Sequence, residues 1–154
     1  MTDPNFTRTV VYLLEHTSSG TVGIVINQAS SHECPERLSL WESVLAPPNN
    51  VFRGGPVQLD GIIGVNLVDS RIETVDLAND VPTHQSTVRL FHGYAGWGPG
   101  QLAAEIADDA WLVVDARPND VFTATPDVLW REVLDRQGGE IAWFATLPSH
   151  PNLN

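Results

Sequence analysis

The stretch TVRLFHGYAGWGPGQLAAEI, residues 87–106, contains four glycines within eight positions. The segment 87–91 before the first glycine is rich in β-branched and apolar side chains, which predicts a strand. Glycines 93–100 then predict a loop. The residues that follow, from 100 to about 108, have Leu102 and Ile106 on one helical face. A strand, a glycine-rich connection and a helix in this order predict an α/β arrangement.

Further strands and helices are predicted on both sides of this stretch. Strands 6–16 and 21–27 flank a turn signal and predict a hairpin, and 71–77 is expected to pair with 61–68. Helix 125–137 carries a capping Thr, a Pro in its first turn and a Gly after its end. The other predicted elements are a helix over 38–45 and strands over 51–53, 110–114 and 141–147.

Because strands and helices are mixed along the chain without a repeat or a linker, we expect one α/β or mixed α+β domain around a sheet. The chain has 154 residues, a length that suits one domain. The expected domain covers residues 1–147, and 148–154 is expected to be a loose tail.

Charge and composition exclude several classes of function. The chain has 19 acidic and 8 basic residues, a formal net charge of −11, and every basic residue is Arg. Without lysine there is no phosphate-binding P-loop and no Schiff-base chemistry. Such an acidic chain repels phosphate backbones, so direct nucleic-acid binding is disfavoured.

We expect a cytoplasmic protein without metal or cofactor. Cys34 is the only cysteine, no apolar run is long enough to span a membrane, and the first residues do not resemble a signal peptide. His32, Glu33 and Cys34 offer metal-ligand types, but no second ligand cluster accompanies them. Pro35 also interrupts the helix that a zinc-protease motif would need.

The glycine-rich stretch has two interpretations. Its backbone could approach a ligand closely, with Tyr94 and Trp97 stacked on a planar group. Alternatively, the glycines permit a tight connection and the two aromatic rings pack in the core. The candidate ligand- or partner-binding residues are Arg8, Asn27, Gly93, Tyr94, Gly96, Trp97, Gln101 and Glu105.

Three charged or polar side chains allow both catalytic and structural interpretations. Gln101 and Glu105 are four residues apart and share a helix face, where they form either a local hydrogen bond or a site with a general base. Arg8 lies in the predicted first strand, where it needs a partner such as Asp3, Glu15 or Glu105, or binds an anion.

Several motifs together resemble the AlgH-like family, also called YqgE/AlgH, over residues 3–139. The resemblance rests on DPNFTRTV (3–10) with Glu15-His16, GIVIN (23–27), VFRGGPV (51–57), GYAGW with PGQL and Glu105-Ile106 (93–106), AWLV (110–113) and Leu129-Trp130.

The resemblance implies a bacterial cytosolic α/β domain with a strongly bent, barrel-like sheet and flanking helices. Two departures concern the start of the chain and the helix after the glycines. Members have an apolar strand before the DPNF segment, so here that strand is absent or the start codon is misplaced, and an absent strand leaves a sheet edge open. Ala103 and Ala104 stand where many members carry an acidic residue.

Three functions remain as hypotheses. The leading one is a non-enzymatic binding or regulatory protein with an unknown small ligand or protein partner. The second is an enzyme for a small anionic substrate, with Glu105 or His16 as general base and Arg8 as anion clamp. The third is the transcriptional regulator that the family's label suggests, although the net charge opposes direct DNA binding.

Overall fold

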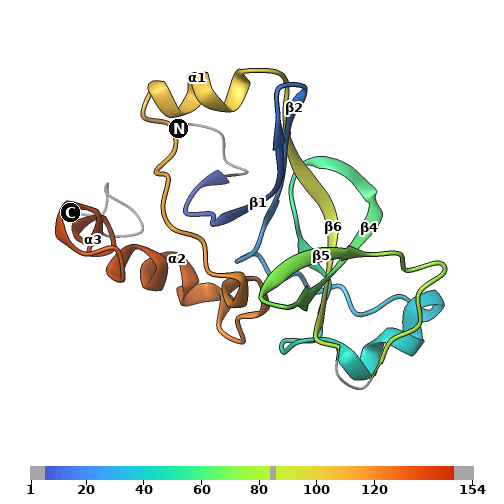
Figure 1. Ribbon diagram of the computed structural model, residues 1–154. Helices are drawn as coiled ribbons and strands as arrows, with labels where there is room; N and C mark the ends of the chain where they lie inside the picture. Colours follow the sequence, from blue (N-terminus) through green and yellow to red (C-terminus); the bar gives the residue numbers. More distant parts are fainter. Residues whose placement is uncertain (1–5, 84–85, 148–154) are drawn as a thin grey trace.

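The computed structural model describes residues 6–83 and 86–147. The predicted tail 148–154 lies outside these ranges. The sheet of the described chain has six strands. Five of them are hydrogen-bonded to one another in the order β1-β2-β6-β4-β5 (Figure 1). The sixth strand, β3 (Phe52–Arg53), pairs in parallel with β6.

Two antiparallel hairpins form the outer parts of the sheet. β1 (Val11–Thr17) pairs with β2 (Gly20–Val25), and β4 (Val57–Val68) pairs with β5 (Arg71–Val75). Both hairpins were predicted. The first strand begins later than expected, because Arg8 has a left-handed φ of 52°. Residues 6–10 are therefore outside the strand that was predicted to contain them.

β6 (Val88–Trp97) is the central strand and pairs with β2, β3 and β4. The prediction of a glycine loop from residue 93 was wrong, since the strand continues to Trp97. Gly93 stays in the strand with a φ of 72°, opposite an irregularity of β4 between Val57 and Ile62. A Cβ at Gly93 would overlap the carbonyl oxygen of Gly55. The backbones of 54–55 and 93–94 thus approach more closely than a side chain allows.

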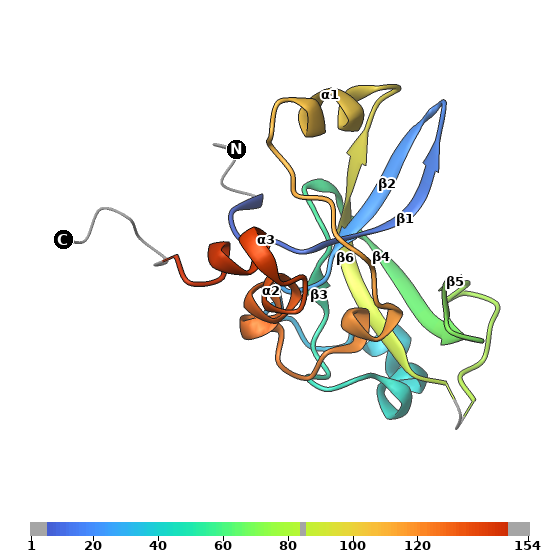
Figure 2. The same cartoon turned by 60° about the vertical axis from the view of Figure 1, so that its left-hand side comes forward.

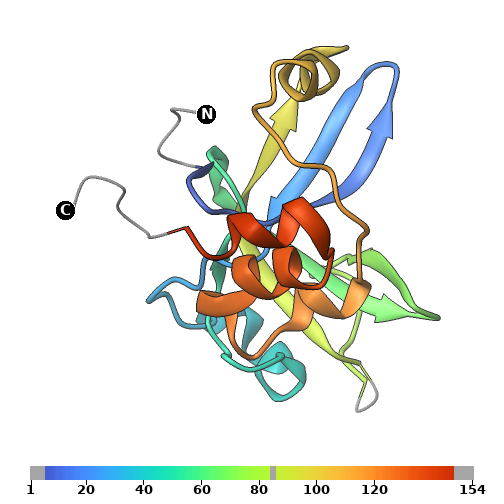
Figure 3. The ribbon, with the colours of Figure 1, turned by 90° about the vertical axis from the view of Figure 1, so that its left-hand side faces the viewer.

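Helices cover the sheet and connect its strands. α1 (Gln101–Ala107) follows β6, the 3-10 helix η2 (Glu36–Val44) lies between β2 and β3, and the 3-10 helix η3 (Pro118–Phe122) leads into α2 (Pro126–Asp135). α3 (Gly139–Phe144) packs beside α2 (Figure 3). The predicted strand 141–147 is therefore wrong, because residues 141–144 are in α3 and 145–147 form a turn.

The predicted strand 110–114 was also wrong, because this segment pairs with no strand in the described part of the chain. It runs from α1 past β1 to the helices at the other end of the molecule (Figure 2). Its backbone is continuous with 115–117, which leads to η3. In the described part of the chain, segment 111–117 therefore begins with an apolar run that favours a strand but lies outside the sheet.

The core has three parts around β6. Residues of β2, β6, η3 and α2, including Ile24, Phe91 and Leu129, form the largest cluster. Trp41 of η2 packs with Val88 and Leu90 in the second. The third contains Ala95, Trp97 and Leu102, so it joins the end of β6 to α1.

The structure confirms the predicted fold class, a single mixed α+β domain with a strongly bent, barrel-like sheet and flanking helices. None of the described helices is long and apolar enough to cross a membrane.

Candidate functional site

The end of β6 and the start of α1 form a hydrogen-bonded network around Glu105. The indole Nε1 atoms of Trp97 and Trp111 both donate to Glu105 Oε2, at 2.9 and 2.8 Å. Gln101 Nε2 donates to Glu105 Oε1 at 3.0 Å. Gly98 N in turn donates to Gln101 Oε1 at 3.0 Å, which fixes the turn between β6 and α1.

The two indoles also pack against each other and against Phe6. The ring centroids of Trp97 and Trp111 are 5.8 Å apart, and Phe6 lies 5.3 Å from Trp111 and 6.3 Å from Trp97. Trp97 is buried, as the structural interpretation of the glycine-rich stretch expected. The pair Gln101 and Glu105 forms the local hydrogen bond that their spacing predicted.

This geometry gives Glu105 a structural task. A general base needs a free lone pair directed at the substrate. Three side-chain hydrogen bonds occupy most of the lone pairs of the Glu105 carboxylate, two on Oε2 and one on Oε1. Through Trp111, the carboxylate holds the beginning of segment 111–117 against α1.

Arg8 and Asn27 form a second group, away from the glutamate network. Asn27 Nδ2 donates to the Arg8 carbonyl oxygen at 2.9 Å, and Asn27 Oδ1 accepts from Val10 N at 2.8 Å. The Arg8 guanidinium lies 4.6 Å from the centroid of the Trp130 ring and donates to the Leu147 carbonyl oxygen at 2.6 Å. Asn27 thus extends the hairpin ladder with its side chain, and Arg8 connects the chain before β1 to the helices.

The remaining predicted residues lie along β6 and at the tip of the hairpin. Gly93 allows its backbone to lie close to that of Gly55. A Cβ placed on Gly96 would lie 3.2 Å from the Tyr94 ring. His16 Nδ1 is 2.6 Å from Thr21 Oγ1. The structure therefore brings together Trp97, Gln101 and Glu105, and separately Arg8 and Asn27. The eight candidate residues do not share one cavity.

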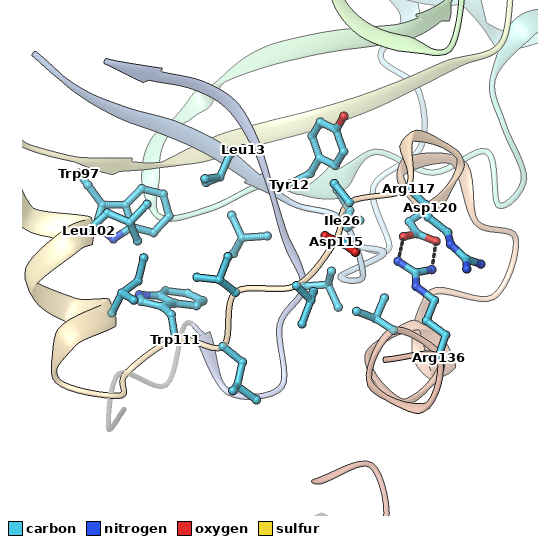
Figure 4. Close-up of a pocket in the computed structure, with 18 residues that line it drawn as sticks. Tyr12, Leu13, Ile26, Trp97, Leu102, Trp111, Asp115, Arg117, Asp120 and Arg136 are labelled. Atoms are coloured by element: carbon cyan, nitrogen blue, oxygen red, sulfur yellow. Dashed lines mark hydrogen bonds and ion pairs between the residues drawn. The ribbon is translucent and has the colours of Figure 1, made fainter. Parts of the chain in front are cut away.

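A cavity of about 250 Å³ forms a slot between β1 and segment 111–117 (Figure 4). Residues 10–13 line one side and residues 111–117 the other. Most of the side chains are apolar. We call this cavity the β1 slot.

The two ends of the β1 slot differ in polarity. Trp97, Leu102 and Trp111 close one end, and the ion pair between Asp120 and Arg136 lies at the other (Figure 4). The pair is bidentate, with Arg136 Nη1 2.8 Å from Asp120 Oδ1 and a second bond from Nη2 to Oδ2. Asp120 raises the pKa of the Arg136 guanidinium, mainly through these hydrogen bonds.

Sequence reasoning identified Trp97 but missed the rest of the slot lining. The apolar run 110–114 predicted a strand. Its failure to pair is what opens the cavity. Asp120 and Arg136 are 16 residues apart, and no local pattern connects them.

A second polar cluster contains His32 and His92. Their ring centroids are 5.2 Å apart, and His92 Nε2 is buried without a hydrogen-bond partner in the described residues. Burial lowers the pKa of His92, and the nearby His32 and Arg53 lower it further. The residues that the structure describes contain no group of three or more His, Cys, Asp or Glu side chains able to hold a metal ion.

Known proteins resemble this chain over nearly its whole length. The UPF0301 protein of Streptomyces avermitilis is 40% identical over 175 aligned positions, which cover 100% of this chain and 90% of the relative. The UPF0301 protein of Nocardia farcinica is 36% identical, with 96% of this chain and 78% of the relative covered.

Two solved structures have the same fold. The crystal structure of a protein from Corynebacterium diphtheriae matches with a TM-score of 0.85 and 28% identity, over 96% of this chain and 86% of that one. The solution structure of the AlgH protein from Pseudomonas aeruginosa matches with a TM-score of 0.68 and 30% identity, over 97% and 89%. The family model described as AlgH-like matches residues 1–142. The chain therefore belongs to the AlgH-like family.

Proposed function

We propose that this protein is a non-catalytic binding protein and that the β1 slot is its ligand site. The observation that carries the proposal is an apolar cavity with one edge strand exposed along it. Leu13 on β1 is 44% exposed, and Leu112 and Val113 opposite are 51% and 70% exposed. Concave, mostly apolar cavities with a few polar groups are typical ligand sites.

The polar groups around the slot support binding more than catalysis. The Glu105 carboxylate is occupied by two indoles and Gln101, and Asp120 is paired with Arg136. These interactions hold the slot walls in place, as a preformed binding site requires. The hypotheses of an enzyme with Glu105 or His16 as base and of a regulator have less support from this geometry.

A neutral fluorescent probe tests the proposal. N-phenyl-1-naphthylamine is apolar and uncharged, so the net charge of −11 does not repel it. We expect saturable binding, with energy transfer from the tryptophans at the slot to the probe. Leu13→Glu places a charge at an exposed slot position and should weaken binding at least tenfold.

Leu59→Glu is the matched control, because Leu59 is 49% exposed on β4 and does not line the slot. The control should bind like the wild type. Absence of probe binding to the wild type, or equal weakening by both substitutions, would contradict the proposal.

A further inference from the structure

The outer edge of β1 carries backbone groups that point into the slot. Ile26 N donates to the Val10 carbonyl oxygen at 2.9 Å, so residue 10 uses the edge facing β2. Val25, which lies opposite Val11, donates its N–H away from β1 to the Gly54 carbonyl oxygen at 2.8 Å. Because ladder bonds alternate along an antiparallel strand, the N–H and C=O of Val11 point away from β2. Leu13 is the last residue before the register of β1 and β2 shifts, and the alternation gives its N–H the same outward direction.

Segment 111–117 lies across the slot from β1. Residues 111–116 make no backbone–backbone hydrogen bond within the described ranges 6–83 and 86–147. The segment is held at its two ends, by Trp111 on Glu105 and by Arg117, whose carbonyl accepts from Asp120 N in η3 at 2.9 Å. Between these ends, Leu112 and Val113 are largely exposed.

An apolar run with strong β propensity, left outside the sheet beside an open sheet edge, is an incomplete β structure. We propose that the β1 slot binds an extended apolar segment of a second polypeptide, which adds to the sheet as a strand between β1 and segment 111–117. This inference rests on the proposed function and names the class of ligand for that site. The added strand would hydrogen-bond to Val11 and Leu13 on one side and to residues 112–114 on the other.

Backbone pairing favours a peptide over a small apolar molecule. A small apolar molecule would cover the side chains and leave the backbone N–H and C=O groups along the slot without partners. An added strand would give hydrogen-bond partners to the backbone groups on both sides of the slot. It would also bury the exposed side chains of Leu13, Leu112 and Val113. The net charge of −11 favours a partner whose apolar segment has basic flanks.

A fluorescein-labelled peptide, Arg-Gly-Val-Leu-Ile-Val-Thr-Val-Gly-Arg, is a suitable probe. We expect saturable binding by fluorescence anisotropy, and slower hydrogen exchange at the amides of both Val11 and Leu13 and of residues 112–114. Failure of this peptide to bind, or protection on only one side of the slot, would overturn the inference.

Two N-methylated peptides make the test independent of any protein variant. One is methylated at every second amide of the central six residues, and the other at the alternate amides. A strand between two neighbours uses both sets, so each methylated peptide should bind at least tenfold more weakly than the parent. The amino-acid sequence and the charge are the same in all three peptides, and the two methylated peptides carry the same number of N-methyl groups. Binding of either methylated peptide within twofold of the parent would contradict insertion between two strands.

Failure of this inference can be distinguished from failure of the proposed function. If N-phenyl-1-naphthylamine binds and Leu13→Glu weakens it while the parent peptide does not bind, the slot is a site for small apolar ligands and the strand inference is wrong.

Discussion

The guanidinium carbon of Arg89 lies 4.0 Å from the centroid of the Phe52 ring, inside the core. Arg89 is 1% exposed, and burial lowers its pKa to about 10. Its Nη2 donates to the carbonyl oxygens of Pro47, at 2.8 Å, and Thr123, at 3.1 Å. One buried cation therefore connects the loop after η2 to the residue that follows η3.

Two substitutions of Arg89 should separate what these hydrogen bonds contribute to the free energy of unfolding from what packing of the side chain contributes. Arg89→Met keeps much of the volume but leaves the Pro47 and Thr123 carbonyls without their donor. We expect it to lower the free energy of unfolding by about 2 kcal/mol. Arg89→Ala also leaves a cavity and should cost about 4 kcal/mol. Urea denaturation measures both. A Met variant as stable as the wild type would show that desolvation of the cation outweighs its hydrogen bonds.

Gly93 and Gly100 provide a matched pair, since their φ angles are 72° and 71°. A Cβ at Gly93 overlaps the Gly55 carbonyl, whereas a Cβ at Gly100 meets no atom within 4 Å. Gly100→Ala should lower the free energy of unfolding by about 1 kcal/mol from backbone strain alone. Gly93→Ala should cost at least about 3 kcal/mol, because the strands around β6 must also separate. Equal costs in thermal denaturation would show that the close approach is not rigid.

Glu105→Gln tests the network at the end of the slot. The amide group of glutamine replaces one acceptor oxygen, so one of the donors from Trp97, Trp111 and Gln101 loses its partner. We expect a loss of about 1–2 kcal/mol in the free energy of unfolding and a changed tryptophan emission. Glu140→Gln in the first turn of α3 is the control and should alter neither quantity appreciably. Unchanged emission in the Glu105 variant would mean that the indoles keep their surroundings without the carboxylate.

His92 should make the fold less stable in mild acid. Its folded-state pKa is lowered below the ordinary value of 6.5, first by burial and then by His32 and Arg53. The unfolded chain therefore takes up the proton first, and this contribution to stability falls as the pH drops below 6.5. An NMR titration of the ring should give a midpoint below 6.5. His32→Asn removes one of the causes, so the midpoint should rise. A midpoint at or above 6.5 in the wild type would contradict this environment.

Local patterns predicted the hairpins and α2, because strands around short turns and an amphipathic helix with Pro in its first turn are encoded within a few residues. The predicted side-chain cap was wrong, since Thr125 makes no side-chain capping hydrogen bond to α2. Segment 93–97 was assigned to a loop, since its glycines look like a turn until Gly55 is placed beside Gly93. Segment 141–147 was predicted to form a strand, but residues 139–144 form a short helix after Gly138.

The candidate site was only partly predictable for a similar reason. The contact between Gln101 and Glu105 follows from helical spacing, and the structure has it. The bond from Trp111 to Glu105 depends on how the chain turns after α1. The cavity lies where residues 111–116 make no backbone–backbone hydrogen bond in the described part of the chain, and no local sequence pattern predicts that an apolar run stays unpaired.

The position of β6 also sets the order in which the chain can fold during synthesis. β2 and β4 are made early, but each needs β6 as its neighbour, and Thr21 pairs with Trp97 far later in the chain. A nascent chain that has not yet released Trp97 from the ribosome holds two separate hairpins, and hairpins alone are marginally stable in water. Closure of the sheet must therefore wait for the last residue of β6, and the interval before it is when the nascent protein most needs protection from aggregation.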